Sequence, residues 1–320
     1  MKIAVLGCGR WGSFITWYLS TFGHDVVEWG REDGKSFLEL KTTGKNQYVK
    51  LNSNVKLTSN LVEAVNGVDL IIVSVLSQSL RQVLTELYSV SDKNVPLLLC
   101  MKGLETETGK RLSEIAVECG FNENNVAVWL GPGHIQEFTN GKPNCMVIDS
   151  ANYDLTVRLA DSLRTNLIRF YYGDDLIGNE IGAASKNVIG IAAGMLDGGG
   201  YTALKGSLMA RGAREISRLI KKMGGNELSA YGLCHLGDYE TTLFSDYSHN
   251  RAYGIAYVKG DKFIKSAEGV ATCKALKLLG EKYGEELPIC NAVYNIIYNK
   301  KDPKETFDGL FGRSSRKEFQ

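Results

Sequence analysis

Lys186 and Asn187 stand in the middle of an otherwise small and apolar stretch that runs from Glu180 to Gly198. Between Ile181 and Met195, Lys186 is the only ionisable side chain. A buried ammonium group is costly unless it is paired, and burial lowers its pKa. A lysine whose pKa is lowered in this way is a candidate general acid or base. The alternative is a structural helix that extends its single lysine to water.

Two other segments place polar or glycine residues directly after apolar runs. In "CMKGLETETGK", Lys102 and Gly103 follow a run that is typical of a buried strand, and in "WLGPGHIQEF" the residues Gly131, Pro132 and Gly133 do so. Ligands of open α/β sheets bind at the carboxyl edge of the strands. We therefore expect both loops to contribute to one wall of an active site, although each alone could be an ordinary turn.

A third polar cluster lies in "HLGDYETTLFSDYSHNRAYG". It contains Asp238, Thr242, Ser248, Asn250 and Arg251 within a segment that has little apolar periodicity. Capping and turn formation explain Ser248 and Asn250 individually. The cluster as a whole predicts a loop and a helix start that face a small polar ligand.

The N-terminal segment "MKIAVLGCGRWGSFITWYLSTFGHDVVEWGRED" predicts dinucleotide binding. Gly7, Gly9 and Gly12 lie between an expected strand and an expected helix, where glycines permit a tight turn and the approach of a pyrophosphate. At the end of the second expected strand stand Arg31, Glu32 and Asp33. An arginine there accommodates a 2′-phosphate and favours NADP, whereas a carboxylate that reaches the ribose indicates NAD.

Elements of two kinds must position these residues. Seven short apolar runs alternate with helical patterns in the first half and predict a parallel sheet covered by helices. From about Gly178 onward only helical patterns follow. The sequence therefore predicts an α/β protein with a Rossmann-type domain over residues 1–178 and an all-helical substrate domain over 179–320. The strand runs are "KIAVLG", "DVVEWG", "DLIIVSV", "VPLLLCM", "NVAVWLG", "NCMVID" and "LIRFYY".

Composition narrows the class of protein further. The 37 basic and 36 acidic residues among 320 leave no overall field to attract nucleic acid or an anionic membrane. No apolar run approaches the roughly 18 residues of a membrane span, so we expect no membrane insertion and a cytoplasmic protein. The seven cysteines and four histidines lack metal-ligand spacing, so no structural metal is expected. A homodimer is an expected assembly.

The chain resembles the NAD(P)-dependent glycerol-3-phosphate dehydrogenases, the soluble bacterial type in particular. The resemblance covers nearly the whole chain and rests on "GCGRWG", "KGLETETGK", "LGPGHIQE", "KNVIGIAAGMLDG", "LGD", "SHNR" and "AEG". It implies interconversion of dihydroxyacetone phosphate and sn-glycerol 3-phosphate for glycerophospholipid synthesis. The implied cofactor is NADP or NAD, and the implied substrate is a small phosphorylated three-carbon compound.

The resemblance also implies roles for individual residues. Lys186 is expected to be the general acid and base, with its pKa lowered by burial and by Lys102, and with Asn187 and Asp238 holding it in orientation. The expected substrate-binding residues are Lys102, Gly131, Gly133, Thr242, Ser248, His249, Asn250 and Arg251. The expected cofactor-binding residues are Gly7, Gly9, Arg10, Trp11, Gly12, Arg31, Lys102, Ile135, His249 and Glu268.

Two segments depart from the family pattern. His249 stands where the family usually has an arginine that touches both cofactor and substrate phosphate. Gly133 replaces a hydroxyl residue, and His134 and Ile135 alter the same loop. Because an imidazole does not reproduce the bidentate contacts of an arginine, we expect these changes to alter substrate affinity.

Two further functions remain open from the sequence. One is a reductase of the same two-domain build that acts on a small oxo-acid such as ketopantoate and needs no phosphate pocket. The other is an NADPH-binding sensor whose catalysis has decayed through the change to His249. The retained Lys102, Lys186 and Asp238 argue against the sensor.

Overall fold

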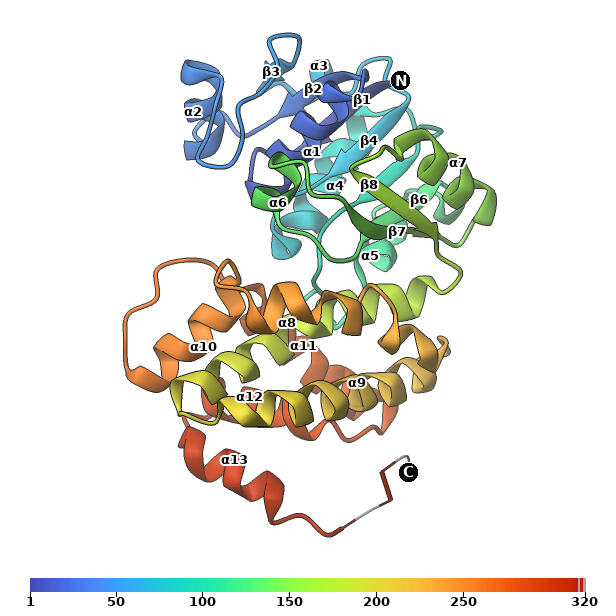
Figure 1. The fold of residues 1–320 in the computed structure, drawn as a ribbon. Helices are drawn as coiled ribbons and strands as arrows, with labels where there is room; N and C mark the ends of the chain where they lie inside the picture. Colours follow the sequence, from blue (N-terminus) through green and yellow to red (C-terminus); the bar gives the residue numbers. More distant parts are fainter. Residues whose placement is uncertain (316, 319–320) are drawn as a thin grey trace. The chain divides into compact units, whose positions relative to one another are not determined.

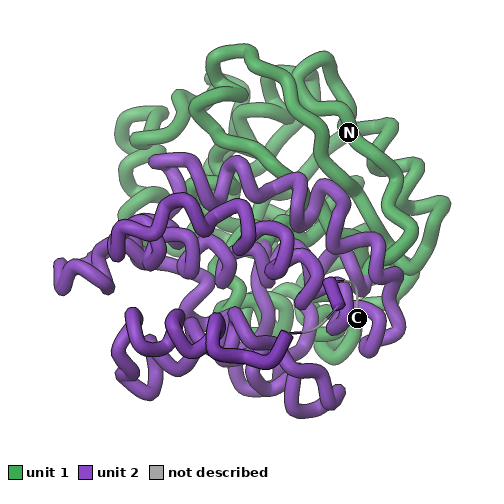
Figure 2. The backbone as a smooth tube through the Cα atoms, turned by 60° about the horizontal axis from the view of Figure 1, so that its bottom comes forward, with its two compact units in different colours: residues 1–101, 112–176 green, residues 102–111, 177–320 purple. Residues whose placement is uncertain are grey.

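The computed structural model describes residues 1–315 and 317–318, and the chain divides into two compact units (Figure 2). Unit 1 comprises Met1–Met101 and Leu112–Leu176, and unit 2 comprises Lys102–Arg111 together with the chain from Ile177 onward. The excursion of Lys102–Arg111 into unit 2 has no counterpart in the sequence-based division at residues 178 and 179, which stays a prediction for the functional domains.

Unit 1 is built on one eight-stranded sheet in the order β3-β2-β1-β4-β5-β6-β7-β8. The strands are β1 Lys2–Leu6, β2 Asp25–Trp29, β3 Lys56–Thr58, β4 Leu70–Val73, β5 Leu97–Leu99, β6 Val126–Leu130, β7 Asn144–Ser150 and β8 Ile168–Tyr172. The helices are α1 Arg10–Thr21, α2 Lys35–Thr43, α3 Leu61–Ala64, α4 Leu80–Val90, α5 Leu112–Glu118, α6 Ile135–Thr139 and α7 Tyr153–Leu163 (Figure 1). This confirms the predicted α/β class.

The sheet differs from the expectation in two details. β3 was not predicted, because it has only three residues and its first side chain is exposed. β7 pairs antiparallel with β6, whereas all other neighbouring strands are parallel. The chain between β6 and β7 carries only the short helix α6, so the sheet is mostly, not wholly, parallel.

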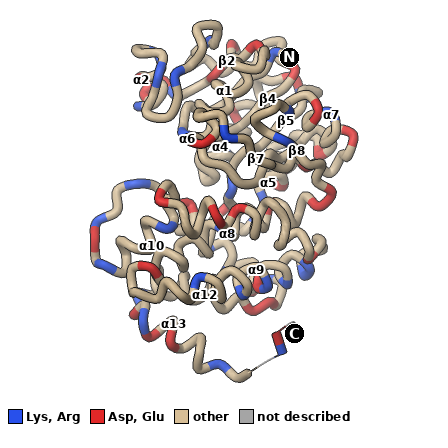
Figure 3. Tube along the Cα trace, in the orientation of Figure 1, with Lys and Arg blue, Asp and Glu red and all other residues tan. Residues whose placement is uncertain are grey.

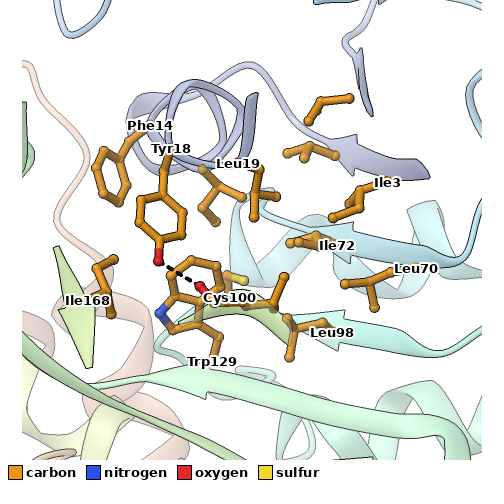
Figure 4. Packing of buried hydrophobic residues seen from close by; sticks show 14 of the residues in the cluster. Ile3, Phe14, Tyr18, Leu19, Leu70, Ile72, Leu98, Cys100, Trp129 and Ile168 are labelled. Carbon is orange, nitrogen blue, oxygen red and sulfur yellow. Dashed lines mark hydrogen bonds between the residues drawn. The ribbon is translucent and has the colours of Figure 1, made fainter. Parts of the chain in front are cut away.

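Aromatic packing fixes α1 on the sheet of unit 1 (Figure 4). The rings of Tyr18 and Trp129 are fully buried and meet edge to face, with centroids 5.9 Å apart. Phe14 of the same helix face is also fully buried, and the Tyr18 hydroxyl donates to the Leu163 carbonyl at 2.6 Å. Edge-to-face aromatic pairs stabilise a core by more than the burial of their apolar surface alone. This packing holds α1, and with it the glycine-rich loop that precedes it.

One carboxyl group lies inside this core. Glu28 of β2 is fully buried, and among the described residues neither carboxyl oxygen has a hydrogen-bond partner of ordinary geometry. Burial raises its pKa to about 8, and the neighbouring Ser13, Cys8 and Thr16 offset only part of that effect. The folded protein therefore keeps a proton on Glu28 that the unfolded chain releases above about pH 4.5.

This linkage predicts a fall in the stability of unit 1 as pH rises. The contribution of Glu28 is fully present below about pH 4.5 and is lost as pH approaches 8, the folded pKa. Glu28→Gln keeps the shape of the neutral acid but cannot ionise. Between pH 5 and 8 its free energy of unfolding should therefore fall less than that of the native protein, by a difference of up to roughly a few kcal/mol. All four tryptophans lie in unit 1, so urea unfolding followed by tryptophan fluorescence reports this unit alone.

The control is Glu32→Gln, because Glu32 lies in an exposed position shortly after the same strand. It should leave the pH dependence of unfolding unchanged. Equal slopes for Glu28→Gln and the native protein would show that Glu28 ionises normally in the fold.

The described part of unit 2 is helical apart from turns, loops and one isolated antiparallel bridge between Leu104 and Arg111. Its main helices are α8 Leu176–Gly198, α9 Lys205–Lys222, α10 His249–Lys259, α11 Glu268–Tyr283, α12 Pro288–Tyr298 and α13 Pro303–Phe311. Glycines of α8 permit close contacts, since a Cβ on Gly194 would lie 2.0 Å from the Arg251 carbonyl oxygen and one on Gly190 2.6 Å from Thr242 Cγ2. The small residues around Lys186 thus allow neighbouring segments to pack closely against α8.

Charges of both signs are distributed along each unit without a single-sign block (Figure 3). Among the described residues, none of the helices combines the length and the apolarity that a membrane crossing requires.

Candidate active site

The centre of the site in unit 2 is one buried carboxylate that binds two lysines. The Nζ atoms of Lys102 and Lys186 each lie 2.8 Å from Asp238 Oδ2. The Asp238 side chain is fully buried, that of Lys186 is 8% exposed and that of Lys102 is 19% exposed. The other carboxylate oxygen, Oδ1, accepts a short hydrogen bond from Thr241. The group carries a net positive charge and can attract an anion or a developing alkoxide.

The charges of this group determine the ionisation of its carboxyl. Burial alone would raise the pKa of Asp238, but the ammonium groups of Lys102 and Lys186 outweigh burial and hold this pKa below its ordinary value. Asp238 is therefore an anion at neutral pH. Breaking such a buried pair by removing one partner is strongly destabilising.

Three elements position these side chains. Lys186 lies at the middle of α8, and Asp238 ends a short 3-10 turn, Leu236–Asp238. A single π-helical turn, Glu240–Phe244, follows and carries Thr242. Lys186 Nζ donates to Thr242 Oγ1 at 2.7 Å, and this hydroxyl donates to the Asp238 carbonyl at 2.7 Å. Thr242, predicted to bind substrate, therefore holds the lysine directly.

Lys102 belongs to this site because its segment packs with the helices. Leu104 is fully buried in the core of unit 2, and Arg111 forms a 2.7 Å ion pair with Glu180 of α8. Sequence reasoning placed Lys102 at the sheet edge. Lys102 does follow β5 along the chain, but its side chain pairs with Asp238 and its carbonyl accepts from Asn187 of α8.

A chain of amide hydrogen bonds ties four segments together. The Asn187 side chain donates to the Lys102 carbonyl at 2.8 Å and accepts from Asn250 at 3.0 Å. Asn250 in turn accepts from the backbone N–H of Gly269, the residue after Glu268 at the start of α11. A Cβ on Gly269 would lie 2.6 Å from the Asn187 carbonyl oxygen. The predicted residues Asn187, Asn250 and Glu268 are thus brought to one place.

The N-terminus of α10 presents the third predicted group. Ser248 is its N-cap and accepts from the Arg251 N–H at 3.3 Å, while the partly buried His249 is the first helical residue. The Arg251 guanidinium forms ion pairs with Asp197 at 2.7 Å and Asp246 at 2.8 Å. The Arg251 guanidinium is therefore paired with two carboxylates of the protein itself.

In unit 1 the glycine-rich loop has the form that the sequence predicts. Gly7 has φ +120°, and a Cβ there would lie 2.3 Å from the Ser74 carbonyl oxygen. A Cβ on Gly12 would lie 1.8 Å from the Gly7 carbonyl oxygen, so both positions require glycine. A Cβ on Gly9, the N-cap of α1, would enter open space. The loop leaves room for a group at the amino end of the helix, where anions bind favourably.

The other cofactor-binding candidates surround this loop within unit 1. Arg10 and Trp11 are the first two residues of α1 and are partly buried. Arg31 is exposed two residues after the end of β2. An exposed arginine at that strand end remains available to a 2′-phosphate.

The loop after β6 explains one departure from the family pattern. A Cβ on Gly133 would lie 2.3 Å from the Phe138 ring, so a residue with a side chain does not fit there without moving the ring. Gly131 has φ +117°, a conformation that favours glycine. Ile135, the first residue of α6, is buried in the core of unit 1. Gly133 thus compensates for the large Phe138.

Sequence reasoning missed two buried groups of unit 2. His235 and Tyr239 are fully buried and hydrogen-bond to each other at 2.7 Å. Lys205 lies 3.0 Å from Asp197, the carboxylate that also binds Arg251. The spacing of His235 and Tyr239, four residues apart, is the only signal that could have indicated their contact.

Comparison with known proteins places the chain in a family. The model described as NAD-dependent glycerol-3-phosphate dehydrogenase N-terminus matches residues 2–156, and the C-terminus model matches residues 175–308. A glycerol-3-phosphate dehydrogenase (NAD(P)+) of Thermoanaerobacter sp. strain X514 is 34% identical over 330 residues, which cover 100% of this chain and 99% of the relative.

Solved structures agree. A glycerol-3-phosphate dehydrogenase from Coxiella burnetii superposes with TM-score 0.90 at 27% identity and covers 98% of this chain and 99% of its own. A ketopantoate reductase from Ralstonia eutropha reaches TM-score 0.61 at 16% identity, covering 96% and 100%, and shares the fold alone. The chain belongs to the NAD-dependent glycerol-3-phosphate dehydrogenase family.

Proposed function

We propose that this protein interconverts dihydroxyacetone phosphate and sn-glycerol 3-phosphate with NADP or NAD, and that Lys186 exchanges the proton. The observation that carries the proposal is the buried group in which Lys102 and Lys186 share one oxygen of Asp238. Membership of the family supports the reaction. The product is a precursor suited to glycerophospholipid synthesis.

In the direction of reduction, the C2 carbonyl oxygen gains negative charge and must receive a proton. Lys186 donates it, and Asp238 and Thr242 fix the donor on a rigid helix. Because a carboxylate partner favours the ammonium form, Asp238 opposes the effect of burial that the sequence led us to expect. In the direction of oxidation, the neutral amine of Lys186 accepts the proton.

Lys102 supplies the second positive charge of the site. Its side chain is more exposed than that of Lys186 and lies on the same carboxylate oxygen. A fixed ammonium group beside a developing alkoxide stabilises it most in a site that excludes water. Asn187 holds the Lys102 backbone by its 2.8 Å hydrogen bond, which preserves this arrangement.

The dinucleotide belongs on the glycine-rich loop of unit 1. The absence of a side chain at Gly9 and the forced glycines at Gly7 and Gly12 fit a pyrophosphate at the amino end of α1. When bound, the nicotinamide supplies or accepts the hydride. Arg31 is placed to contact a 2′-phosphate, which favours NADP.

The substrate phosphate belongs at the N-terminus of α10, where the helix dipole favours an anion. Ser248, His249 and Asn250 stand there, whereas Arg251 is held by Asp197 and Asp246. His249 is therefore the side chain that takes the place of the family's usual arginine.

The test is the oxidation of NADPH and of NADH by the purified protein with dihydroxyacetone phosphate, with ketopantoate as control substrate. We expect turnover with the phosphorylated substrate and none with the oxo-acid. Turnover with ketopantoate alone would contradict the proposal. Tight NADPH binding without turnover on either substrate would instead favour the sensor.

Cofactor preference is predicted to depend on Arg31. Arg31→Ala should raise the KM for NADPH and leave that for NADH almost unchanged, because only NADPH carries the 2′-phosphate that the guanidinium would bind. The measurement is the KM for both cofactors at saturating dihydroxyacetone phosphate. Arg158→Ala, elsewhere in unit 1, is the control. An equal loss with both cofactors would contradict this assignment.

Substrate affinity is predicted to depend on pH through His249. A free imidazole has a pKa of about 6.5 and a phosphate dianion favours its cation, so the KM for dihydroxyacetone phosphate should rise between roughly pH 6 and 8. His249→Arg should lower this KM and flatten the rise, because an arginine stays charged. His249→Ala should raise the KM and also flatten it.

Both variants are needed, because the substrate phosphate also titrates in this range. If both reproduced the native pH profile, His249 would not face the phosphate.

A further inference from the structure

His235 and Tyr239 form a fully buried pair on either side of Asp238 along the chain, the carboxylate that pairs with Lys186. His235 Nδ1 lies 2.8 Å from the Gly182 carbonyl oxygen of α8, and the Tyr239 hydroxyl lies 2.7 Å from His235 Nε2. The two rings meet edge to face, with centroids 4.8 Å apart. Neither side chain has a role in the reaction derived above.

The partners fix the protonation state of the imidazole. A carbonyl oxygen only accepts hydrogen bonds, so Nδ1 carries the proton and Nε2 accepts from the Tyr239 hydroxyl. Burial lowers the pKa of His235 to about 4, and Lys186 acts in the same direction, while the backbone of Gly182 and of Gly212 and the charge of Asp238 oppose it. The ring is therefore neutral at physiological pH, and its hydrogen-bonding pattern does not change there.

The contact with α8 lies one turn before the reactive lysine. In an α-helix the carbonyl of residue 182 accepts the N–H of residue 186, so His235 binds the same carbonyl as the Lys186 backbone. A Cβ on Gly182 would lie 3.0 Å from His235 Cβ, so the missing side chain permits this close approach.

The same residue also fixes the turn that bears the carboxylate. The Asp238 N–H donates to the His235 carbonyl at 3.0 Å, and His235 is the residue before the turn Leu236–Asp238. On the far side, a Cβ on Gly212 of α9 would lie 3.1 Å from the Tyr239 hydroxyl. His235 thus contacts both elements that carry the Lys186–Asp238 pair, and Tyr239 braces it against α9.

We propose that His235, held in place by Tyr239, is a positioning residue. It fixes the contact between Asp238 and Lys186, and through this contact it positions Lys186 as the proton donor of the reaction. The inference rests on the proposed function of Lys186. If the brace is lost, the turn can move relative to α8, and a weaker carboxylate contact favours the neutral amine of Lys186. Displacements of about 1 Å can cost up to about 100-fold in rate.

The test compares His235→Ala, His235→Asn and Tyr239→Phe. His235→Ala removes both hydrogen bonds and should lower kcat for reduction by about 10- to 100-fold with little change in cofactor affinity. The limb on which kcat falls with rising pH should move to lower pH, because reduction needs the ammonium form. His235→Asn keeps an N–H donor for the Gly182 carbonyl and should restore most of kcat. Tyr239→Phe should give a smaller shift in the same direction.

The outcomes separate this inference from the proposed function. An inactive native protein would refute the proposed function, whereas an active native protein with a folded His235→Ala variant of native kcat and pH profile would overturn the positioning role. A variant that loses thermal stability but keeps the native pH profile would also overturn it. If His235→Ala does not fold, Tyr239→Phe decides, because it removes one hydroxyl only; a native pH profile for that variant would then refute the role.

Discussion

Lys186→Ala is expected to lower kcat for dihydroxyacetone phosphate reduction by at least about 10²- to 10⁴-fold, the range typical of a general acid. The NADPH dissociation constant should hardly change, because Lys186 acts on the substrate carbonyl and is not among the expected cofactor-binding residues. Steady-state kinetics and fluorescence titration with NADPH measure the two quantities. The lost group is the proton donor, so added substrate should not restore the rate.

Two further variants make this result specific. Lys186→Met keeps the apolar stem of the side chain and should be as inactive as the alanine variant, which excludes a cavity as the cause. Lys277→Ala removes a half-exposed lysine of α11 that pairs with Glu281, and should behave as the native protein. A Lys186→Met enzyme with most of the native kcat would show that another group donates the proton.

Much of the fold could be predicted from the sequence because buried parallel strands are short apolar runs between turn residues. All seven predicted runs correspond to strands. The three-residue β3 is too short to show periodicity. The antiparallel direction of β7 depends on how the chain returns after α6, and no local pattern records that.

The site was predictable only where a side chain is chemically out of place. Lys186 is conspicuous because its neighbours are small and apolar, and Asp238 because it lies in a polar cluster. Asp197, one partner of Arg251, lies 54 residues away along the chain, and Asn187, one partner of Asn250, lies 63 residues away. Local sequence therefore assigned to a ligand two side chains that the fold also uses to join its helices.

The excursion of Lys102–Arg111 into unit 2 follows from contacts of the same long range. Lys274 of α11 pairs with Glu107 at 2.8 Å, and a Cβ on Gly109 would lie 3.2 Å from Leu279. The local sequence of the loop indicates neither contact, because it is typical of a simple strand end.

Asp238→Asn is expected to abolish reduction and also to destabilise unit 2 by about 3–5 kcal/mol, the cost of leaving a buried charge without its partner. The amide keeps the shape of the carboxylate but leaves Lys102 and Lys186 facing each other without a counter-charge. Because the folded pKa of Asp238 is lowered, its stabilisation is present above about pH 4, the unfolded value, and is lost as pH falls through the folded pKa. The thermal midpoints of native and variant proteins should therefore converge in acid.

The double variant Lys186→Met with Asp238→Asn distinguishes an uncompensated charge from a damaged fold. Replacing the lysine removes one of the two ammonium groups that the amide cannot neutralise, so the double variant should unfold at a higher temperature than Asp238→Asn alone while remaining inactive. A double-mutant cycle measures this coupling as the interaction free energy between the two residues in contact. If the second change gave no recovery of stability, the cost of Asp238→Asn would lie in the turn itself, in the hydrogen bond to Thr241, and not in the two lysines that share its carboxylate.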